Sequence, residues 1–434
     1  MVKLFPHQSE ALNSTSDKNR VAFYHDMGLG KTFTGGEKMI QLGAKVNLVI
    51  CQKSKIEDWV EHFKVNGRAS DGALVDDVLD LTDKKHFELF IGLLKVNCFP
   101  PTYMAVGVIN YELAFRRPEL AKLTDFTLML DESSLIQNEQ AKRTKFILNK
   151  LKPANVILLS GTPTGGKYEN LYSQLKLLGW DISKTTYWNT YIEYHFEDFG
   201  GFPVKVVDGY KNVDRLKRKM REYGCHFLKT EDVLDLPEQI FTTVRIPVSK
   251  EYRKFRKDRV IEVDGTTLVG DNTLTKMLYE RQLCAQYSQA KLEAFRDLVE
   301  STEDRLIVFY NFTAELDNFV KPINEEIKRP VSIVNGQYKD LTAYEKCGNS
   351  ITFIQYQAGA MGLNLQKANK IIYYSPPLSS ELYEQSKKRI NRIGQDRTCY
   401  YYNLTVTGSI EEHIYKALAM RRDYTEALFE EENI

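Results

Sequence analysis

The sequence predicts an α/β protein built from two parallel β-sheets, each in its own lobe. Short apolar runs rich in β-branched and aromatic residues recur along the chain, and their length suits strands buried on both faces of a parallel sheet. Stretches with helical periodicity separate these runs, as repeated strand–helix–strand units require. The runs fall into two sets, and 434 residues are too many for a single hydrophobic core.

The positions of the apolar runs define the expected strands and lobes. The first set lies at 20–25, 46–52, 103–110, 126–132 and 155–161, and the second at 305–311, 331–336, 350–357, 370–375 and 399–406. We therefore expect a first lobe at 1–180 and a second at 238–434. The aromatic, charged segment between them, 181–237, is expected to be a helical insertion and connector. A charged amphipathic helix near the C-terminus is expected to pack back on the body.

Composition limits the classes of function. The chain carries 59 Lys and Arg against 58 Asp and Glu, so a polyanionic partner would be held by local basic patches rather than by net charge. The N-terminal MVKLFPHQSE has no apolar core of a signal peptide, and no apolar run approaches ~18 residues. We therefore expect a cytoplasmic protein without a membrane segment.

The clearest motif is MGLGKT at 27–32, between the strand at 20–25 and a helical stretch. Gly28 and Gly30, with Leu29 between them, let backbone amides approach phosphates closely. Lys31 would reach the β- and γ-phosphates of a nucleotide, and the Thr32 hydroxyl would bind Mg²⁺. The usual first glycine of this motif is replaced by His25. The alternative is a glycine-rich turn followed by a chance Lys-Thr.

Two further strands end in polar residues. FTLMLDESS ends in Asp131 and Glu132, and the carboxyl end of a strand is where an α/β sheet binds its ligand. Asp131 can hold Mg²⁺, and Glu132 can polarise the attacking water. NVILLSGTP brings Ser160 and Thr162 to the same edge. They could hydrogen-bond the acidic pair and sense the γ-phosphate, or belong to an ordinary Gly-Pro turn.

The stretch KKRINRIGQDR at 387–397 is expected to be helical. A serine at 379 or 380 can cap this helix and Gly394 can end it. Arg389 and Arg392 are then three residues apart and share one face.

Ile390 and Ile393 would anchor that helix to the core and fix where the arginines point. Guanidinium groups suit the spreading of phosphate charge. Lys387, Lys388 and Arg397 are expected to be solvated or to make weak DNA contacts.

Taken in order, these motifs resemble those of superfamily-two helicases. The ordered set is HQ at 7–8, MGLGKT, DESS, LSGTP, MGLNL at 361–365 and QSKKRINRIGQ at 385–395. The element R-x-x-R-I-G-Q is similar to that of the Swi/Snf-type ATPases in particular. CHFLKTEDVLDLPEQI resembles the connector of the same family. The resemblance runs from about residue 4 to residue 425.

The resemblance implies two RecA-like lobes with ATP and Mg²⁺ in the cleft between them, and translocation along double-stranded DNA without necessary strand separation. Gln8 would contact the adenine edge. Gly362 and Asn364 would lie in motif V, which couples nucleotide to DNA. Gln385, Arg389 and Arg392 would lie in motif VI, and we expect Arg389 and Arg392 to be arginine fingers supplied in cis. The remaining nucleotide-binding and catalytic positions are Gly28, Leu29, Gly30, Lys31, Thr32, Asp131 and Glu132.

The chain also departs from the family pattern. The acidic motif is DESS, not DEAH or DEGH, so contact between motifs II and III would fall to Ser133 or Ser134. TGGKYEN follows GTP where nucleosome remodellers have P-I-Q-N, which argues against nucleosomes as substrate. The compact core looks more like prokaryotic or viral relatives. We expect a monomer acting on duplex DNA, with DNA-bound proteins or a targeting subunit as further partners.

Polar residues that follow the expected strands are candidate DNA contacts. They are Lys53, Ser54, Asn110, Tyr111, Asn311 and Gln357. Ordinary loop polarity explains each of them equally well. The basic stretch 215–223 is better explained as a solvated helix face, and Trp59 by core packing with Ile56 and Phe63 rather than by base stacking.

Three functions remain open at this point. The first is an ATP-driven double-stranded DNA translocase, and the second is a strand-separating DNA or RNA helicase of the same superfamily. The third is a nucleotide-gated binding module without hydrolysis. The presence of Lys31, Asp131, Glu132, Arg389 and Arg392 disfavours the third, and the R-I-G-Q element and the Leu-Pro connector favour the first over the second.

Overall fold

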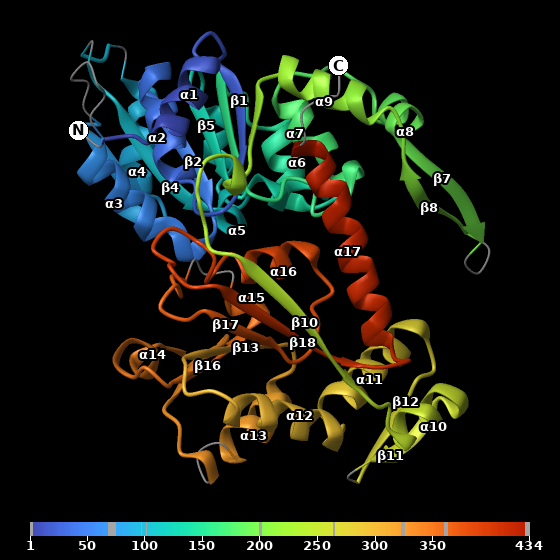
Figure 1. Cartoon of the computed structure of the whole chain (residues 1–434). Coiled ribbons are helices and arrows are strands. Elements are labelled where there is room, and N and C mark those ends of the chain that lie inside the picture. Colours follow the sequence, from blue (N-terminus) through green and yellow to red (C-terminus); the bar gives the residue numbers. More distant parts are fainter. Residues whose placement is uncertain are drawn as a thin grey trace. The chain divides into compact units, whose positions relative to one another are not determined.

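The computed structural model describes residues 3–67, 75–96, 98–100, 102–198, 202–263, 265–322, 326–359 and 363–429. The chain divides into two compact units, which Figure 1 shows with their elements labelled. Unit 1 comprises Met1–Val233 and Asp423–Ile434, and unit 2 comprises Leu234–Arg422. Unit 1 therefore extends beyond the expected boundary at residue 180. Within the described residues, no helix is both long and apolar enough to cross a membrane.

Unit 1 contains a seven-stranded parallel sheet in the order β3-β4-β2-β5-β6-β1-β9. All five strands predicted for the first lobe are present: β1 (Arg20–His25), β2 (Val46–Cys51), β4 (Ala105–Asn110), β5 (Thr127–Asp131) and β6 (Asn155–Ser160). The sequence did not predict the two edge strands, β3 (Asp77–Asp80) and β9 (Cys225–Leu228). Both are four residues long, and their side chains are only partly buried, so neither forms a long apolar run.

Helices cover both faces of this sheet. Neighbouring strand residues point to opposite sides, so a continuous apolar strand presents apolar side chains on both faces. Val21 and Phe23 join a core formed with helices on one face, and Ala22 and Tyr24 join the core on the other. The helices of the first face are α1 (Pro6–Ser14), α2 (Lys31–Leu42) and α3 (Ile56–Asn66). Those packed in the second core include α4 (Lys84–Gly92), α5 (Tyr111–Ala114), α6 (Lys142–Asn149) and α7 (Tyr172–Leu177).

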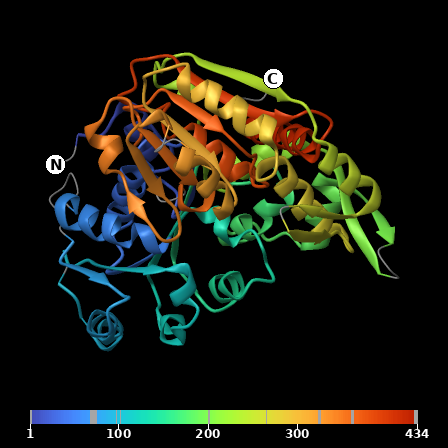
Figure 2. The same ribbon diagram turned by 90° about the horizontal axis from the view of Figure 1, so that it is seen from below.

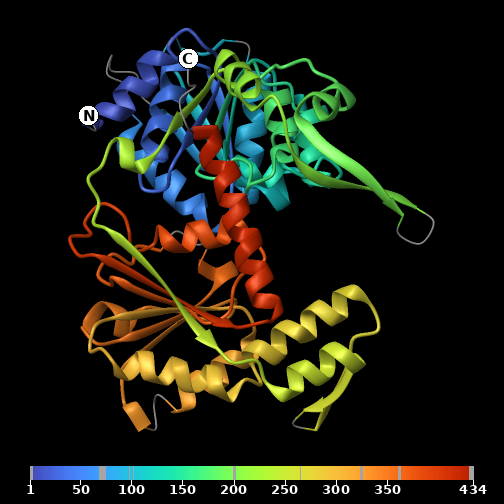
Figure 3. The same cartoon turned by 45° about the vertical axis from the view of Figure 1, so that its right-hand side comes forward.

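The segment expected to be a helical insertion contains an antiparallel hairpin as well as helices. The hairpin consists of β7 (Ile192–Asp198) and β8 (Pro203–Tyr210), between α8 (Lys184–Tyr191) and α9 (Val213–Glu222). Figure 3 shows it extending away from the body of unit 1. At the end of the chain, the Tyr168 hydroxyl donates to the Tyr424 carbonyl at 2.9 Å. This contact agrees with the expectation that the C-terminal helix packs on the body.

Unit 2 contains a second seven-stranded sheet, in the order β10-β18-β17-β13-β16-β14-β15. The five predicted strands are confirmed as β13 (Leu306–Tyr310), β14 (Val331–Val334), β16 (Ile351–Gln355), β17 (Lys370–Tyr373) and β18 (Cys399–Val406). The edge strand β10 (Gln239–Ile246) pairs in parallel with β18, and the short β15 (Lys339–Asp340) is antiparallel to β14. The sequence missed β10 because most of its side chains are exposed and it forms no apolar run.

Two apolar cores flank the sheet of unit 2. Phe295 of α12 (Gln289–Glu300) packs on one face, where Figure 2 shows this helix lying along the strands. Ile414 of α17 (Ile410–Phe429) belongs to the core on the other face, together with Tyr383 of α16 (Ser380–Lys387). The remaining elements are α10 (Lys250–Asp258), β11 (Val260–Val263), β12 (Thr266–Val269), α11 (Thr273–Ala285), α13 (Thr313–Pro322), α14 (Thr342–Lys346) and α15 (Tyr356–Gly359).

Candidate active site

The glycine loop, residues 26–30, connects the end of β1 to the start of α2 at Lys31. Gly28 and Gly30 have φ angles of 89° and 71°, in the left-handed region that favours glycine. A Cβ atom on Gly30 would lie 2.3 Å from Nε2 of Gln8. The loop therefore requires glycine at position 30 for both conformation and space.

Gln8 holds this loop from the adjacent helix α1. Its Nε2 donates to the carbonyls of Leu29 and Gly30 at 3.3 and 3.2 Å, and its Oε1 accepts from the Phe5 amide at 2.9 Å. The buried side chain thus uses its amide within the protein. A contact between Gln8 and an adenine edge stays a prediction, whereas its support of the glycine loop was not foreseen.

Lys31 lies across the glycine loop. Its Nζ donates to the carbonyls of His25 and Asp26 at 2.8 and 3.1 Å, which directs its positive charge toward the ends of the neighbouring strands. His25 is fully buried, and its ring nitrogen lies 2.9 Å from that of His226 on β9. Burial, and then the neighbouring His226 and Lys31, lower the pKa of His25 well below its usual value, so a neutral ring occupies the position of the usual glycine.

The two acids follow β5 directly. Trp59 of α3 donates its indole N–H to Oδ2 of Asp131 at 2.8 Å, and the Tyr111 hydroxyl donates to the Asp131 carbonyl at 2.9 Å. Glu132 has a φ of 53°, which is uncommon for a residue other than glycine and is typical of functional turns. Burial raises the pKa of Asp131, while the Trp59 hydrogen bond and the charge of Lys31 act against that rise.

Trp59 thus has a role beyond the predicted core packing. Its side chain is only 1% exposed and stacks on Phe63, as the helical spacing predicted. The hydrogen bond from its N–H to Asp131 could not be predicted, because the two residues are 72 positions apart in the sequence. The buried tryptophan therefore fixes the orientation of the Asp131 carboxylate.

Gln174 of α7 connects the acidic motif DESS after β5 (motif II) to the segment SGTP at the end of β6 (motif III). Ser133 donates its hydroxyl to Oε1 of Gln174 at 2.7 Å, and Nε2 of Gln174 donates to the Pro163 carbonyl at 2.8 Å. The Tyr24 hydroxyl donates to the same Oε1 at 3.0 Å. Ser133 therefore takes the place expected for it, but the bridging glutamine was missed. The sequence feature that could have indicated this bridge is a glutamine among the leucines of α7, since a buried glutamine needs hydrogen-bond partners.

The connector is attached to the glycine loop. Oδ2 of Asp26 accepts hydrogen bonds from the amide and the hydroxyl of Thr230, both at 3.1 Å. Four residues of β9 pair in parallel with β1 immediately before this point. The glycine loop is therefore in direct contact with the residues that lead out of unit 1.

In unit 2, helix α16 ends earlier than predicted. The Ser379 side chain accepts from the Leu382 amide at 3.2 Å, which confirms the expected N-cap, but the helix stops at Lys387 rather than at Gly394. The Arg389 carbonyl instead accepts from the Leu365 amide at 3.1 Å. Long-range contacts therefore replace the local hydrogen bonds of a helix, and the two arginines lie in the turns that follow α16.

These turns are held by Gln395 and Ile390. Nε2 of Gln395 donates to the carbonyls of Gln366, Ala368 and Ile390, at 3.2, 2.8 and 3.3 Å. Ile390 is fully buried, as predicted, whereas Ile393 is 44% exposed and the prediction that it anchors the segment was wrong. The glutamine of R-I-G-Q is thus a structural residue that ties motif VI to motif V.

Arg392 contacts Asn364, the one predicted motif V residue that lies within the described residues. Its Nη1 donates to Oδ1 of Asn364, and burial lowers its pKa from the usual value, although a guanidinium group remains charged. Gln385 is buried and donates to Glu381 at 3.3 Å. Arg389 is half-buried beside them. Gly362 lies outside the described residues.

The predicted DNA contacts differ in exposure. Lys53, Ser54 and Gln357 are exposed, while Tyr111 is buried behind the acidic pair. The side chain of Asn110 donates to Glu112 at 3.0 Å. That of Asn311 donates to the carbonyls of Ser375 and Pro376. The DNA roles of all six stay predictions, and Tyr111 and Asn311 have structural roles in addition.

Lys387 is not solvated as expected. It is 6% exposed and forms a 2.6 Å ion pair with Glu384. The expectation of a solvated side chain was therefore wrong for this lysine, which lies against the rings of Tyr383 and Phe241. A weak DNA contact stays a prediction.

The fold and this set of residues define an α/β protein of two units, with a glycine-rich loop before α2 in one unit and an arginine pair after α16 in the other. A family model described as SNF2-related domain matches residues 7–289, and one described as helicase conserved C-terminal domain matches residues 290–394. The first match covers more than half of the chain. The chain therefore belongs to the SNF2-related domain family.

Curated relatives are longer proteins for the most part. A putative ATP-dependent helicase/translocase YwqA of Bacillus subtilis is 26% identical over 349 residues, which is 73% of this chain and 37% of that protein. The SWI/SNF-related matrix-associated actin-dependent regulator of chromatin subfamily A-like protein 1 of Xenopus laevis is 22% identical, over 95% of this chain and 42% of that protein. The chain thus spans about two fifths of the length of these relatives.

A third relative is closer in length. The uncharacterized ATP-dependent helicase YqhH of Bacillus subtilis is 23% identical over 95% of this chain and 77% of that protein. Among solved structures, the Sulfolobus solfataricus SWI2/SNF2 ATPase core in complex with dsDNA is similar at a TM-score of 0.44 and 19% identity. That similarity covers 98% of this chain and 92% of the solved one.

Proposed function

We propose that the chain is a nucleic-acid-stimulated ATPase that hydrolyses Mg²⁺-bound ATP and translocates along double-stranded DNA. The observation that carries the proposal is the edge of the unit 1 sheet where β1, β5 and β6 end side by side. The glycine loop with Lys31 follows β1, Asp131 ends β5, and Ser160 ends β6. A cation, a carboxylate pair and backbone amides at the carboxyl ends of adjacent parallel strands are what phosphoryl transfer from a nucleotide requires.

The residues of unit 1 fit ATP and Mg²⁺. A side chain at position 30 would collide with the Gln8 amide, so only glycine keeps the loop in this conformation against α1. Thr32 and Asp131 offer the hydroxyl and carboxylate oxygens that Mg²⁺ prefers. Bound Mg²⁺ would neutralise charge on the β- and γ-phosphates. Lys31 would bind the same phosphates, and Glu132 would orient the attacking water.

Arg389 and Arg392 of unit 2 would stabilise the charge that develops on the transferred phosphoryl group. As the family resemblance implies, ATP binding is expected to draw these arginines to the phosphates held by unit 1. The hydrogen bond from Arg392 to Asn364 supports a link between motif VI and motif V, which in this family couples nucleotide to DNA.

Duplex tracking is preferred over strand separation because of two sequence elements. The R-I-G-Q segment and the Leu-Pro connector are similar to those of Swi/Snf-type ATPases. The alternative is a strand-separating helicase acting on DNA or RNA. The chain is expected to act as a monomer, on DNA that carries bound proteins or with a targeting subunit.

Displacement of a third strand from a DNA triplex distinguishes these alternatives. The wild-type chain with ATP should displace the third strand, because a motor that tracks a duplex removes what is bound to it. It should leave a forked duplex paired. The Lys31→Ala variant serves as the control for ATP-driven motion. Fork unwinding without triplex displacement would establish the helicase instead.

A further inference from the structure

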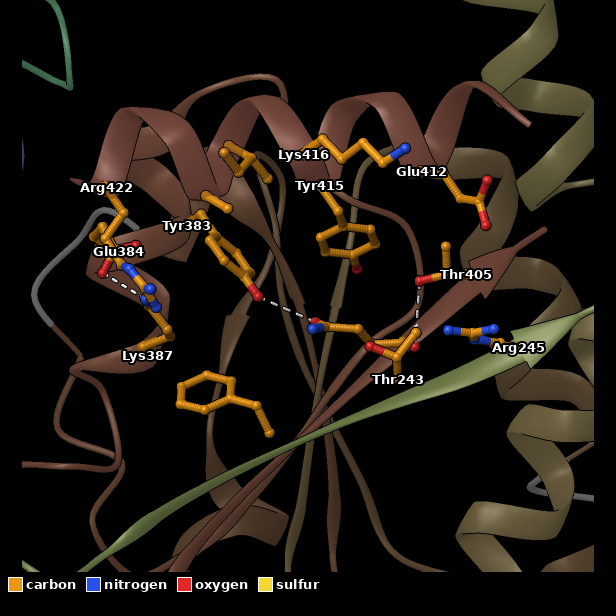
Figure 4. Close-up of a pocket in the computed structure, with 14 residues that line it drawn as sticks. Thr243, Arg245, Tyr383, Glu384, Lys387, Thr405, Glu412, Tyr415, Lys416 and Arg422 are labelled. Atoms are coloured by element: carbon orange, nitrogen blue, oxygen red, sulfur yellow. Dashed lines mark hydrogen bonds and ion pairs between the residues drawn. The ribbon is translucent and has the colours of Figure 1, made fainter. Parts of the chain in front are cut away.

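Unit 2 contains a cavity of about 500 Å³ that none of the predicted catalytic residues lines. Strands β10 and β18 form its floor, α17 covers it, and α16 forms one wall (Figure 4). Its size is within the range of small-molecule sites, roughly 300–1,000 Å³. The cavity lies wholly within one compact unit.

The floor of this cavity is polar, unlike an ordinary contact between a sheet and a helix. Thr243 of β10 and Asn403 and Thr405 of β18 line it. Packing alone would favour apolar side chains between a sheet and the helix that covers it. Asn403 accepts from the Tyr383 hydroxyl at 3.1 Å, which fixes its amide within the wall. The polar residues are therefore organised around the space rather than filling it.

The lining carries an excess of positive charge. Arg245, Lys387, Lys416 and Arg422 face the carboxylates of Glu384 and Glu412. Glu384 pairs with Lys387 at 2.6 Å, and Glu412 accepts from the Gly408 amide at 3.1 Å. Within the described part of the chain, Arg245 and Lys416 have no hydrogen-bond or ion-pair partner of their own. Two cations thus remain available to an incoming anion.

The cations are distributed over both ends of the cavity. Figure 4 shows Arg245 near Thr405 and Glu412 at one end, and Lys387 and Arg422 at the other. The Lys387 ammonium lies over the rings of Tyr383 and Phe241, at 5.0 and 5.6 Å. These aromatic contacts hold the buried lysine in place at the cavity wall.

Two buried polar atoms of the lining have no hydrogen-bond partner. They are the hydroxyl oxygen of Tyr415 and Oε1 of Glu384. Buried polar groups are normally paired, so each marks a place for a ligand atom. The Tyr415 hydroxyl can donate to an anionic oxygen, and the Glu384 oxygen can accept from a hydroxyl group. A phosphate with a P–OH group satisfies both, and a backbone phosphodiester, which has no hydroxyl of its own, satisfies the first.

We propose that this cavity binds a phosphate-bearing anion, from a small phosphate compound or from the backbone of bound nucleic acid. Arg245 and Lys416 supply the unpaired charge, and Tyr415 supplies a hydroxyl donor. The site is separate from the proposed ATP site, and its test does not depend on ATP hydrolysis.

The test uses the full chain with Lys31→Ala, which weakens phosphate binding at the glycine loop. Binding of pyrophosphate is measured by titration calorimetry for this chain and for the same chain with Arg245→Ala and Lys416→Ala added. Loss of two charge-assisted contacts should weaken binding about tenfold or more. Both residues are on the cavity rim, and an unchanged thermal unfolding midpoint shows that the variant folds. Lys250→Ala, an exposed lysine on α10, is the matched control and should bind as the parent does.

A competing short DNA duplex separates the two sources of phosphate. If the duplex displaces pyrophosphate and the double substitution also weakens duplex binding, the ligand is a backbone phosphate. If the duplex does not compete while pyrophosphate binding still depends on Arg245 and Lys416, the ligand is a small phosphate compound. Equal pyrophosphate affinity with and without these two residues, or no binding to the Lys31→Ala chain at millimolar concentration, overturns the proposal.

Discussion

The indole N–H of Trp59 reaches the carboxylate proposed to hold Mg²⁺. Its 2.8 Å hydrogen bond fixes the orientation of the Asp131 carboxylate and stabilises its ionised form, against the burial that raises its pKa. Trp59 touches neither nucleotide nor metal in this account, so it is a positioning residue. Its effect should appear in the dependence of activity on Mg²⁺ and pH rather than in nucleotide affinity alone.

Replacement of Trp59 by Phe keeps the aromatic packing and removes the N–H. A hydrogen bond to a charged group contributes about 1.5–3 kcal/mol, so kcat should fall roughly ten- to hundredfold at limiting Mg²⁺. The pKa of Asp131 should rise further, because the group that favours its ionised form is gone. The acidic limb of the pH–rate profile should therefore move to higher pH.

The matched control for this substitution is Trp188→Phe, which makes the same change on α8, far in sequence from the acidic motif. It should leave both the Mg²⁺ dependence and the pH profile unchanged. An identical pH profile and Mg²⁺ requirement in Trp59→Phe and the wild type would rule out the positioning role.

Arg392 is the residue expected to act on the transition state. Arg392→Ala should leave ATP binding largely intact and lower the rate of hydrolysis by about 10³–10⁵, the range found for arginine fingers. Lysine should not restore activity, because it lacks the planar fork. Lys388→Ala, on the same segment, is the control. Nucleotide affinity is measured with a fluorescent ATP analogue and hydrolysis by phosphate release; unchanged turnover in Arg392→Ala would remove the finger assignment.

At the scale of elements, the buried strands could be predicted and the elements held by distant contacts could not. Each of the ten expected strands is present, because a continuous apolar run has few other places in a folded chain. The helix expected to continue to Gly394 ends at Lys387, since the side chain of Gln395 and the amide of Leu365 take its carbonyls. Sequence periodicity contains no information about such long-range partners.

The same distinction applies to the candidate site. The motif residues around the glycine loop and the acidic pair could be named from spacing and chemistry alone. Their supports could not, because Trp59, Gln174 and Thr230 are far in sequence from the groups they contact. The hairpin β7–β8 was missed for another reason. Most of its side chains are exposed, so neither strand forms the continuous apolar run by which the buried strands were predicted.

Helix α13 contributes a buried carboxylate beneath a predicted DNA contact. Oε2 of Glu315 accepts from the Asn311 amide at 3.1 Å and from the Ser375 hydroxyl at 3.2 Å. Burial raises the pKa of Glu315 to about 7. Below its ordinary pKa of 4.5 the Glu315 carboxyl is protonated in both the folded and the unfolded state, so its ionisation does not lower the free energy of unfolding. As pH rises from that value to about 7, the folded state holds the proton more tightly, so the free energy of unfolding falls.

Replacement of Glu315 by Gln should reduce the fall of the free energy of unfolding between pH 4.5 and about 7. The loss expected for the wild type amounts to about 3 kcal/mol across the window, because each pKa unit corresponds to about 1.4 kcal/mol. Denaturant unfolding between pH 4.5 and 8 measures it for the wild type, Glu315→Gln and the exposed-site control Glu300→Gln. A wild-type slope that persists in Glu315→Gln contradicts the assignment of the raised pKa to this group.

At the scale of the whole molecule, the near-neutral charge makes DNA binding a matter of local contacts. The chain carries 59 basic and 58 acidic residues, so non-specific attraction from net charge is small. Phosphate contacts release counterions, and duplex affinity should therefore fall linearly on a plot of log affinity against log salt concentration. Fluorescence anisotropy with a labelled duplex measures the slope. A flat response would argue against a groove that follows the DNA backbone.

The proposed function is tested most directly by the effect of nucleic acids on ATP hydrolysis. Steady-state ATPase rates are measured for the wild type with no nucleic acid, duplex DNA, single-stranded DNA and RNA, with Lys31→Ala as the background. Duplex DNA should give the largest stimulation, and Lys31→Ala should show no activity above background with any of them. Stimulation by RNA alone, or full activity in Lys31→Ala, would contradict the proposed function.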